Sequence, residues 1–321
     1  MHIISLGVVL QLYLYETLPE IIYRYFRLFP AFRYSPAPDE ANYIIGSAVM
    51  IFSSAAASLI TGAFIILCMK KFAPKPAGAA KSVGGEPISF KFNLPKNFFA
   101  LLAVGLCIVQ ISVFLYIAFN QGLYSVFGIE SNLSSDNYFP QTAAGITVFF
   151  MSAVVTPSIF EEFIFRYIML NHLKKYGNAF AIITTSVLFG FAHARVSAFI
   201  YATAVGLFSA YIAIKTKSVW FPIILHAVVN GMVFVFQYLS SRLLLEAAIT
   251  DIIHFTYLSF ISAVSFVYLL VLIIKRKNTG LAEPGKHIYI SNGRKLLLFF
   301  NAASLLFFIL TILKSAEEYV F

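Results

Sequence analysis

Several side chains that could do chemistry lie inside long apolar runs of this sequence. These ionisable or strongly polar groups are Glu161, Glu162, Arg166, His193, His226 and Asn230. Carboxylate, imidazole and amide groups can together support acid–base catalysis, metal binding or the movement of ions. A charge in the middle of a membrane costs roughly 2.5–3.5 kcal/mol on insertion scales, so these groups indicate a functional site.

The spacing of these residues predicts which of them share a helix face. His226 and Asn230 are four residues apart, which places them on one face, one turn from each other. Phe189 and His193 have the same spacing. At about 1.5 Å per residue, Glu161, His193 and Asn230 lie roughly 20, 21 and 18 Å from the same side of the membrane, so three helices bring polar groups to one layer.

The segment around Glu161 has two further features. Glu162 and Arg166 are four residues apart, so they can pair within the helix and reduce the cost of keeping both charges in lipid. Glu161 points away from that pair and can face another helix. Pro157 and Pro222 each precede a polar motif by four residues, where the missing backbone donor can open the helix.

The composition indicates that lipid surrounds the elements carrying these groups. The chain is 60% hydrophobic and 12% charged, with mean hydropathy +0.84, whereas soluble domains have roughly 25% charged residues. We predict an all-α fold, a polytopic transmembrane helix bundle with about eight membrane helices. The predicted spans are residues 43–69, 98–119, 143–170, 179–194, 197–214, 219–239, 252–274 and 296–313. Residues 1–26 are also apolar but carry charges in their second half, so they either span the membrane or lie in its interface.

Basic residues mark one side of this bundle. The loops 70–96, 171–178, 215–218 and 275–295 carry most of the Lys and Arg residues, and the loop 120–142 carries none. The positive-inside rule places the four basic loops in the cytoplasm and the C-terminal end on the other side. The net charge of +9 therefore reflects membrane topology, and we expect no nucleic-acid partner. Cys68 and Cys107 lie in separate apolar segments and are expected to be small packing residues.

An ordered set of three motifs resembles the CAAX-protease and bacteriocin-processing family of intramembrane proteases. The set consists of Glu161-Glu162-x-x-x-Arg166, Phe189-x-x-x-His193 and His226-x-x-x-Asn230 on three successive polar-bearing helices. Each motif alone is a weak signal, whereas the ordered trio at one depth is specific. The resemblance covers about residues 143–239, which we treat as a catalytic helical core between membrane helices in residues 1–142 and 240–321.

The resemblance implies a role for each of these residues. Glu161 with His193 would hold and activate a water molecule, and His226 with Asn230 would donate hydrogen bonds to the oxyanion formed at the scissile carbonyl. Glu162 and Arg166 would support these groups or hold substrate, although a purely structural ion pair is equally consistent with their spacing.

The sequence leaves the use of a metal open. The resemblance favours a glutamate mechanism without a cofactor, and no H-E-x-x-H motif is present. If zinc were used, Glu161, His193 and His226 would supply the carboxylate and the two nitrogens that zinc hydrolases employ.

The expected function is that of an intramembrane endopeptidase in a bacterial plasma membrane, with a membrane-associated or lipidated peptide or protein as its substrate. The alternative is a non-catalytic membrane partner, such as a bacteriocin self-immunity protein or a sensor-kinase scaffold. A scaffold has no physical need to keep charges in lipid, which favours the enzyme. A transporter would also carry ionisable groups at mid-membrane, but the sequence shows no internal duplication.

Overall fold

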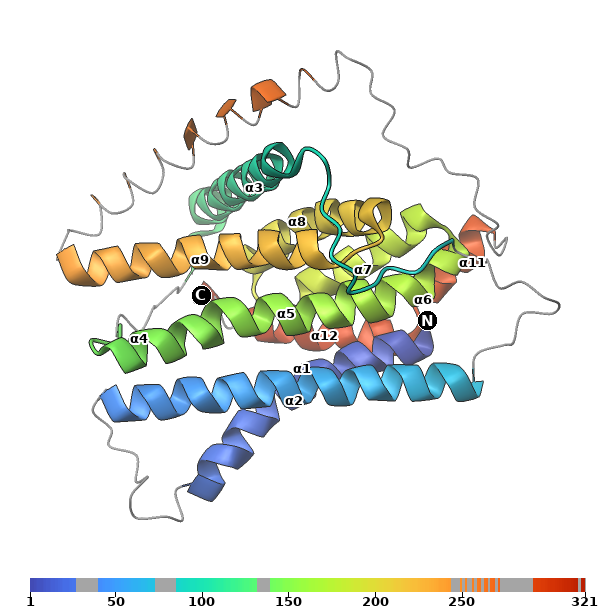
Figure 1. The fold of residues 1–321 in the computed structure, drawn as a ribbon, viewed down its shortest axis with the longest axis horizontal. Coiled ribbons are helices and arrows are strands. Elements are labelled where there is room, and N and C mark those ends of the chain that lie inside the picture. Colours follow the sequence, from blue (N-terminus) through green and yellow to red (C-terminus); the bar gives the residue numbers. More distant parts are fainter. Residues whose placement is uncertain are drawn as a thin grey trace.

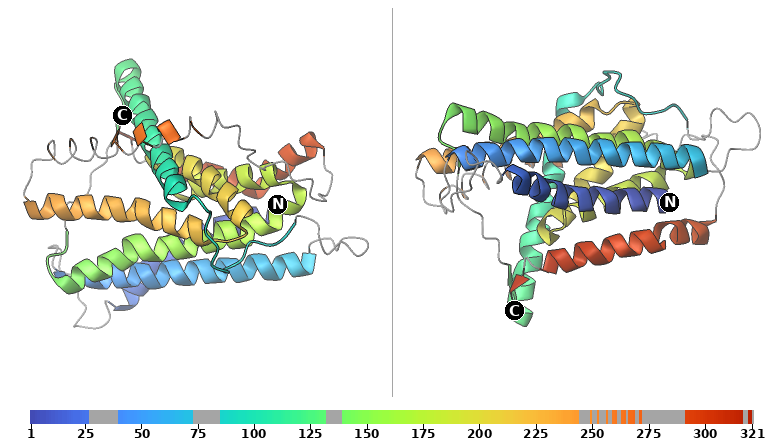
Figure 2. Two further views of the ribbon diagram at one scale, coloured as in Figure 1. Left: turned by 45° about the horizontal axis from the view of Figure 1, so that its top comes forward. Right: turned by 90° about the horizontal axis from the view of Figure 1, so that it is seen from below.

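The computed structural model describes residues 1–26, 40–72, 85–131, 139–243, 291–316 and 319–320, with single positions between 249 and 271. The helices are α1 (His2–Phe26), α2 (Glu40–Phe72), α3 (Phe98–Phe127), α4 (Ala143–Phe150), α5 (Thr156–Glu162), α6 (Asn171–Leu173), α7 (Asn178–Ala192), α8 (Val196–Thr216), α9 (Trp220–Leu243), α11 (Asn292–Phe299) and α12 (Ala302–Ala316). They form an all-α bundle in which α2, the helix around α5, and α9 run roughly along one direction (Figure 1), while α3 crosses them at a large angle (Figure 2). Two-residue strands, β1 (Glu130–Ser131) and β2 (Tyr319–Val320), pair antiparallel.

The predicted polytopic architecture is confirmed, but the number of eight spans is not. Among the described residues, five helices are long and apolar enough to cross a membrane: Glu40–Phe72, Phe98–Phe127, Ala143–Tyr176, Ala198–Thr216 and Trp220–Arg242. The pair α11 and α12, bent by 51°, makes a sixth if it is one span. The segment predicted at 179–194 forms α7, a shorter apolar helix of 15 residues. The predicted span 252–274 lies outside the continuously described residues.

The helix that carries the glutamates is continuous but irregular. Between Ala143 and Tyr176 the α-helical pieces α4, α5 and α6 alternate with two π-helical stretches, Met151–Val155 and Phe163–Leu170. Pro157 is the second residue of α5, directly after the first π-helical stretch, so the predicted local disturbance is present there. Pro222 instead lies in the first turn of α9, where a proline leaves no helical hydrogen bond unmade.

The loops that the charge pattern assigned to opposite sides of the membrane lie at opposite ends of the bundle. At one end, Glu40 accepts a hydrogen bond of 2.8 Å from the Gln141 backbone N–H, and the Arg242 guanidinium donates to the Gln141 side chain at 2.9 Å. The pairing of β1 with β2 brings the chain after α3 together with the chain after α12. At the other end lie the lysines of the last turns of α2 and α8 and those directly after α6 and α8.

Helix α1, whose placement the sequence left open, lies between α2 and α12 (Figure 2). Gln11 donates a hydrogen bond of 3.0 Å to Ser58 on α2, and Ser5 lies 2.6 Å from the Ser304 hydroxyl on α12. Hydrogen bonds of this kind hold membrane helices together where the hydrophobic effect cannot. Helix α1 is therefore an integral wall of the bundle.

Candidate active site

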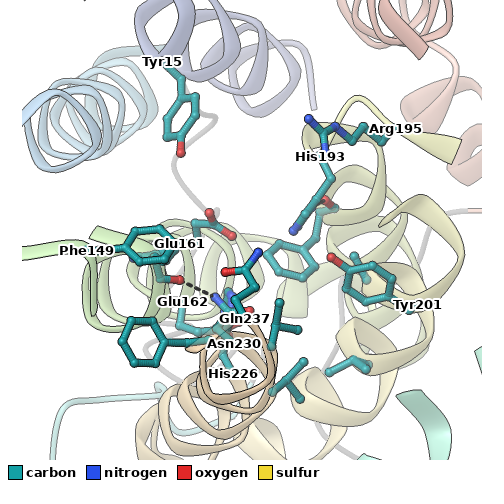
Figure 3. A pocket seen from close by; sticks show the side chains of 18 residues that line it. Tyr15, Phe149, Glu161, Glu162, His193, Arg195, Tyr201, His226, Asn230 and Gln237 are labelled. Atoms are coloured by element: carbon teal, nitrogen blue, oxygen red, sulfur yellow. Dashed lines mark hydrogen bonds and ion pairs between the residues drawn. The ribbon is translucent and has the colours of Figure 1, made fainter. Parts of the chain in front are cut away.

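A cavity of about 500 Å³ lies among α1, α5, α7, α8 and α9. Five of the side chains that the sequence singled out line it: Glu161, Glu162, His193, His226 and Asn230. Figure 3 shows Glu161 and His193 on opposite sides of the opening, with His226 and Asn230 beside them on α9. Arg166, the sixth, is fully buried behind the cavity. The structure thus brings three separate helices together around one polar space.

The neighbouring glutamates have different surroundings. Glu161 is partly exposed to the cavity, and its carboxylate makes no hydrogen bond or ion pair with any residue that the structure describes. Glu162 is 2% exposed and accepts from the Arg166 guanidinium, with 2.8 Å between Oε2 and Nε. Its other oxygen, Oε1, lies 3.2 Å from Nδ1 of His226. Glu161 is therefore free to bind a water molecule, while Glu162 is committed to the protein.

The predicted pairing of Glu162 with Arg166 is confirmed, and the link from Glu162 to His226 is a contact that the sequence did not predict. A carboxylate on Nδ1 fixes the orientation of the imidazole and stabilises its protonated form, as the aspartate does in serine-protease triads. The Arg166 guanidinium also lies over the ring of Phe189, 4.9 Å from the centroid. Arg166, Glu162 and His226 therefore form one chain of polar contacts that ends at the cavity.

His193 follows the last residue of α7, and two features fix its position. Its Nδ1 lies 2.9 Å from the carbonyl oxygen of Phe189, and since a carbonyl only accepts, Nδ1 carries the proton and Nε2 is left as an acceptor. Gly190 allows the close approach of α7 to α8, because a Cβ there would lie 2.0 Å from Oγ1 of Thr203. Ala194, with φ +50°, then turns the chain sharply into α8.

Asn230 is tied to the irregular part of the glutamate helix. Pro157 has no N–H to donate to the carbonyl four residues earlier, that of Ala153. Nδ2 of Asn230 donates a hydrogen bond of 3.2 Å to this oxygen. One amide hydrogen therefore positions the side chain, and the second stays available to a ligand. The proline and the asparagine thus act as a pair, although they belong to separate helices.

The structure describes how the three candidate metal ligands lie. Within the described part of the chain, no three His, Cys, Asp or Glu side chains converge closely enough to hold a metal ion as they stand. Glu161, His193 and His226 line the same cavity without forming a ligand set in this arrangement.

The structure adds two side chains that sequence reasoning missed. Tyr15 of α1 and Arg195 of the α7–α8 turn line the main cavity, and the Tyr15 hydroxyl points toward Glu161 (Figure 3). Both also line a second cavity of about 280 Å³, which shares Glu161 and His193 with the first. Arg195 could have been found from its place two residues after His193. No local signal marked Tyr15.

Comparisons with known proteins match the part of the chain that carries this site. Residues 143–232 match the model of the family described as type II CAAX prenyl endopeptidase Rce1-like. The chain is 30% identical over 156 residues to YdiL of Bacillus subtilis (strain 168), which its name provisionally describes as a membrane peptidase. That alignment covers 46% of this chain and 64% of the relative's length. No solved structure matches the chain significantly. The ordered motifs, their meeting in one cavity and these matches show that residues 143–232 of this multi-pass membrane protein are similar to the type II CAAX prenyl endopeptidase Rce1-like family.

Proposed function

We propose that the protein is an intramembrane endopeptidase that hydrolyses a peptide bond of a membrane-associated or lipidated protein. The observation that carries the proposal is the contrast between two adjacent glutamates. Glu161 has no partner among the described residues and faces the cavity, whereas Glu162 is held by Arg166 and His226. An unpartnered carboxylate inside a membrane bundle lowers the stability of the protein. Its presence therefore indicates a functional role.

In the proposed reaction, Glu161 takes a proton from a water molecule as the water oxygen attacks the scissile carbonyl carbon. Nε2 of His193, the free acceptor of that ring, orients the same water. The carbonyl oxygen becomes an oxyanion, which accepts hydrogen bonds from protonated His226 and from the free amide hydrogen of Asn230. The tetrahedral intermediate then breaks at the C–N bond. Glu161 returns its proton to the leaving nitrogen, so that one water molecule is consumed for each bond cleaved.

Arg166 acts in this proposal through Glu162 rather than on the substrate. It is fully buried and is not among the cavity-lining residues. Its charge keeps Glu162 ionised, and ionised Glu162 in turn stabilises the protonated form of His226. No step of the proposed reaction needs a metal.

The test compares Glu161→Gln with wild type in cells that otherwise lack the protein. Gln keeps the shape of the side chain and removes the base. We expect normal insertion of the variant and loss of specific cleavage products from membrane and released peptides, as measured by mass spectrometry. Glu20→Gln is the matched control, because Glu20 forms an exposed ion pair with Arg24 on α1, and such pairs contribute little. His193→Ala should reproduce the loss.

The alternative function, a non-catalytic immunity or scaffold protein, makes the opposite prediction. If Glu161→Gln and His193→Ala release every wild-type peptide and also rescue the deletion phenotype, the peptidase proposal is wrong and the scaffold takes its place.

A further inference from the structure

The bundle has one lysine-rich end and one lysine-poor end. Among the described residues, the lysines of the rich end are Lys70, Lys71, Lys91, Lys96, Lys174, Lys175, Lys215 and Lys217. The opposite end, where α4 begins and α9 finishes, carries Arg242, which is bound to Gln141, and the same half holds Arg24, Arg195 and Lys314, fewer basic residues than the lysine-rich end. Lysine and arginine accumulate on the cytoplasmic side of membrane proteins. The lysine-rich end is therefore assigned to the cytoplasm.

Both site cavities lie in the lysine-poor half. On α9 the residues lining the main cavity run from His226 to Gln237, which at 1.5 Å per residue covers about 16 Å toward the lysine-poor end. On the glutamate helix they run from Phe149 to Glu162, again on the side away from the lysines. The exposed side chains of Arg195 and Gln237 lie at the outer limit of this space.

The short helix α7 explains why a hollow forms on that side. Its 15 residues span about 22 Å, less than the roughly 30 Å of a hydrocarbon core. The α7–α8 turn at Ala194 therefore ends short of the lysine-poor surface. Above that turn the flanking helices α1, α9 and α12 continue, and residues of all three line the two cavities.

The lysine-rich end is closed by the segment 85–97, which crosses it like a strap (Figure 1). The side chain of Asn171 accepts from the Ile88 N–H and donates to the Ile88 carbonyl, both at 2.8 Å. Asn93 donates to the Thr216 carbonyl at 2.7 Å. Ile88 itself is 1% exposed and belongs to the hydrophobic core.

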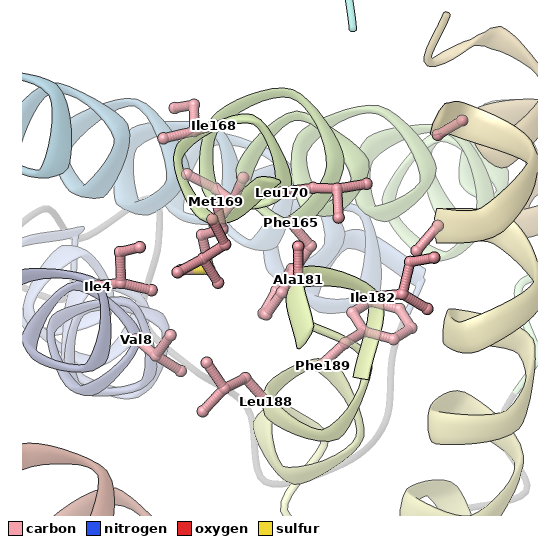
Figure 4. Close-up of a cluster of buried hydrophobic side chains, with 14 of the residues drawn as sticks. Ile4, Val8, Phe165, Ile168, Met169, Leu170, Ala181, Ile182, Leu188 and Phe189 are labelled. Atoms are coloured by element: carbon pink, nitrogen blue, oxygen red, sulfur yellow. The ribbon is translucent and has the colours of Figure 1, made fainter. Parts of the chain in front are cut away.

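That core fills the space between the strap and the site. Its buried members include Phe165, Ile168, Leu170 and Leu188, and it reaches Phe189 under the catalytic histidines (Figure 4). Glycine at position 62 lets α2 approach this core closely, because a Cβ there would lie 2.7 Å from Cδ1 of Ile168. Among the described residues, packing of this kind fills the space between the site and the lysine-rich end.

We propose that the substrate enters from the extracytoplasmic face, so that the bond cut lies in the outer half of the bilayer, in an exported or outward-anchored polypeptide. The substrate class rests on the proposed peptidase function, whereas the direction of access rests only on the charges, the cavities and the strap. Hydrophobic residues of the cut segment would contact the apolar part of the cavity wall, which includes Phe149, Val229, Val233 and Phe234.

Cysteine labelling in intact cells tests the direction of access. The background replaces Cys68 and Cys107 by serine and alanine, and a membrane-impermeant maleimide is the probe. Single cysteines at Gln237 and, as a second outer position, Ser241 should be labelled in intact cells. A cysteine at Lys91 on the strap should be labelled only after lysis. Labelling of Lys91→Cys in intact cells, or silence of both outer positions, overturns the proposal.

A cysteine inside the cavity separates access from orientation. Val229 lies between the two motif residues of α9 and lines the cavity. Val229→Cys should react with a small impermeant thiosulfonate in intact cells, and exclusion of that reagent until lysis would contradict entry from outside. None of these measurements needs catalysis. A wrong direction of access would therefore leave the peptidase proposal standing, and loss of the peptidase proposal would leave the labelling result unchanged.

Discussion

Replacing Glu162 by Gln should lower the stability of the protein far more than the same change at Glu161. Arg166 is 0% exposed and Glu162 2% exposed, and 2.8 Å separates their bonded atoms. Nη1 and Nη2 of Arg166 have no hydrogen-bond partner among the described residues. The Glu162 carboxylate is therefore the group that balances the charge of the buried guanidinium. Removing one partner of such a pair costs about 3–5 kcal/mol, because the remaining charge stays buried and uncompensated.

The assay follows thermal unfolding in detergent through the accessibility of Cys107, which is 1% exposed in the fold. A thiol-reactive fluorescent dye reports its release. At about 2.1 cal/mol/K of unfolding entropy per residue, a chain of 321 residues shifts its Tm by about 1.5 °C per kcal/mol, so Glu162→Gln should lower Tm by about 5–8 °C. Glu161→Gln should change it by no more than about 3 °C, because Glu161 has no partner among the described residues to lose.

A double variant separates charge compensation from general disruption. Glu162→Gln together with Arg166→Met removes both charges, and replacing a buried pair by residues of similar volume is often neutral. The double variant should therefore recover at least half of the stability lost by Glu162→Gln. If Glu162→Gln melts like wild type, or if the double variant loses more stability than the sum of the losses in the two single variants, the ion pair does not stabilise the fold as argued.

Two further predictions concern residues around the site. Tyr15→Phe removes a hydroxyl that points toward Glu161 across the cavity. Loss of the hydrogen bond that this hydroxyl can make to a bound water molecule, worth about 0.5–1.5 kcal/mol, should lower the rate of product formation roughly 2- to 10-fold without changing Tm. Tyr13→Phe on the same helix, at a side chain that is 63% exposed, should leave the rate unchanged, and equal effects of the two variants would exclude a role for Tyr15. Ala194→Gly should change the free energy of unfolding by no more than about 1 kcal/mol, because relief of the positive φ, worth about 1–2 kcal/mol, is offset by the entropy that glycine adds to the unfolded chain. A larger loss in chemical denaturation would show that the Ala194 methyl group matters for packing.

Contacts within one helix could be predicted from the sequence, and contacts between helices could not. The spacing of Glu162 and Arg166 was sufficient to predict their ion pair, because helical geometry fixes neighbours at four residues. The bond from Glu162 to His226 joins residues 64 positions apart and depends on how α9 is rotated against the glutamate helix. Hydropathy does not encode that rotation. The matching depth of the motifs still predicted that their helices meet in one layer.

The limits of the fold prediction have similar causes. Apolar composition does not distinguish a full span from a shorter buried helix, so α7 was predicted with the same status as α2 although it has 15 residues rather than 33. Helix α1 carries charges and Pro19, which made its segment resemble an interfacial helix. Its integration depends on hydrogen bonds to α2 and α12, such as that of Gln11 with Ser58, which only the assembled bundle provides.

The strap at residues 85–97 has a consequence for the cell as well as for the enzyme. A hydrolase inside a membrane must admit water, and a continuous water path would let protons and ions run down their gradients. Here Phe189 lines the main cavity and also belongs to the packed core, and that core extends to Ile88 at the lysine-rich end. The two asparagines that fasten the strap, Asn93 and Asn171, therefore help to keep the membrane tight to ions while its interior remains open to chemistry.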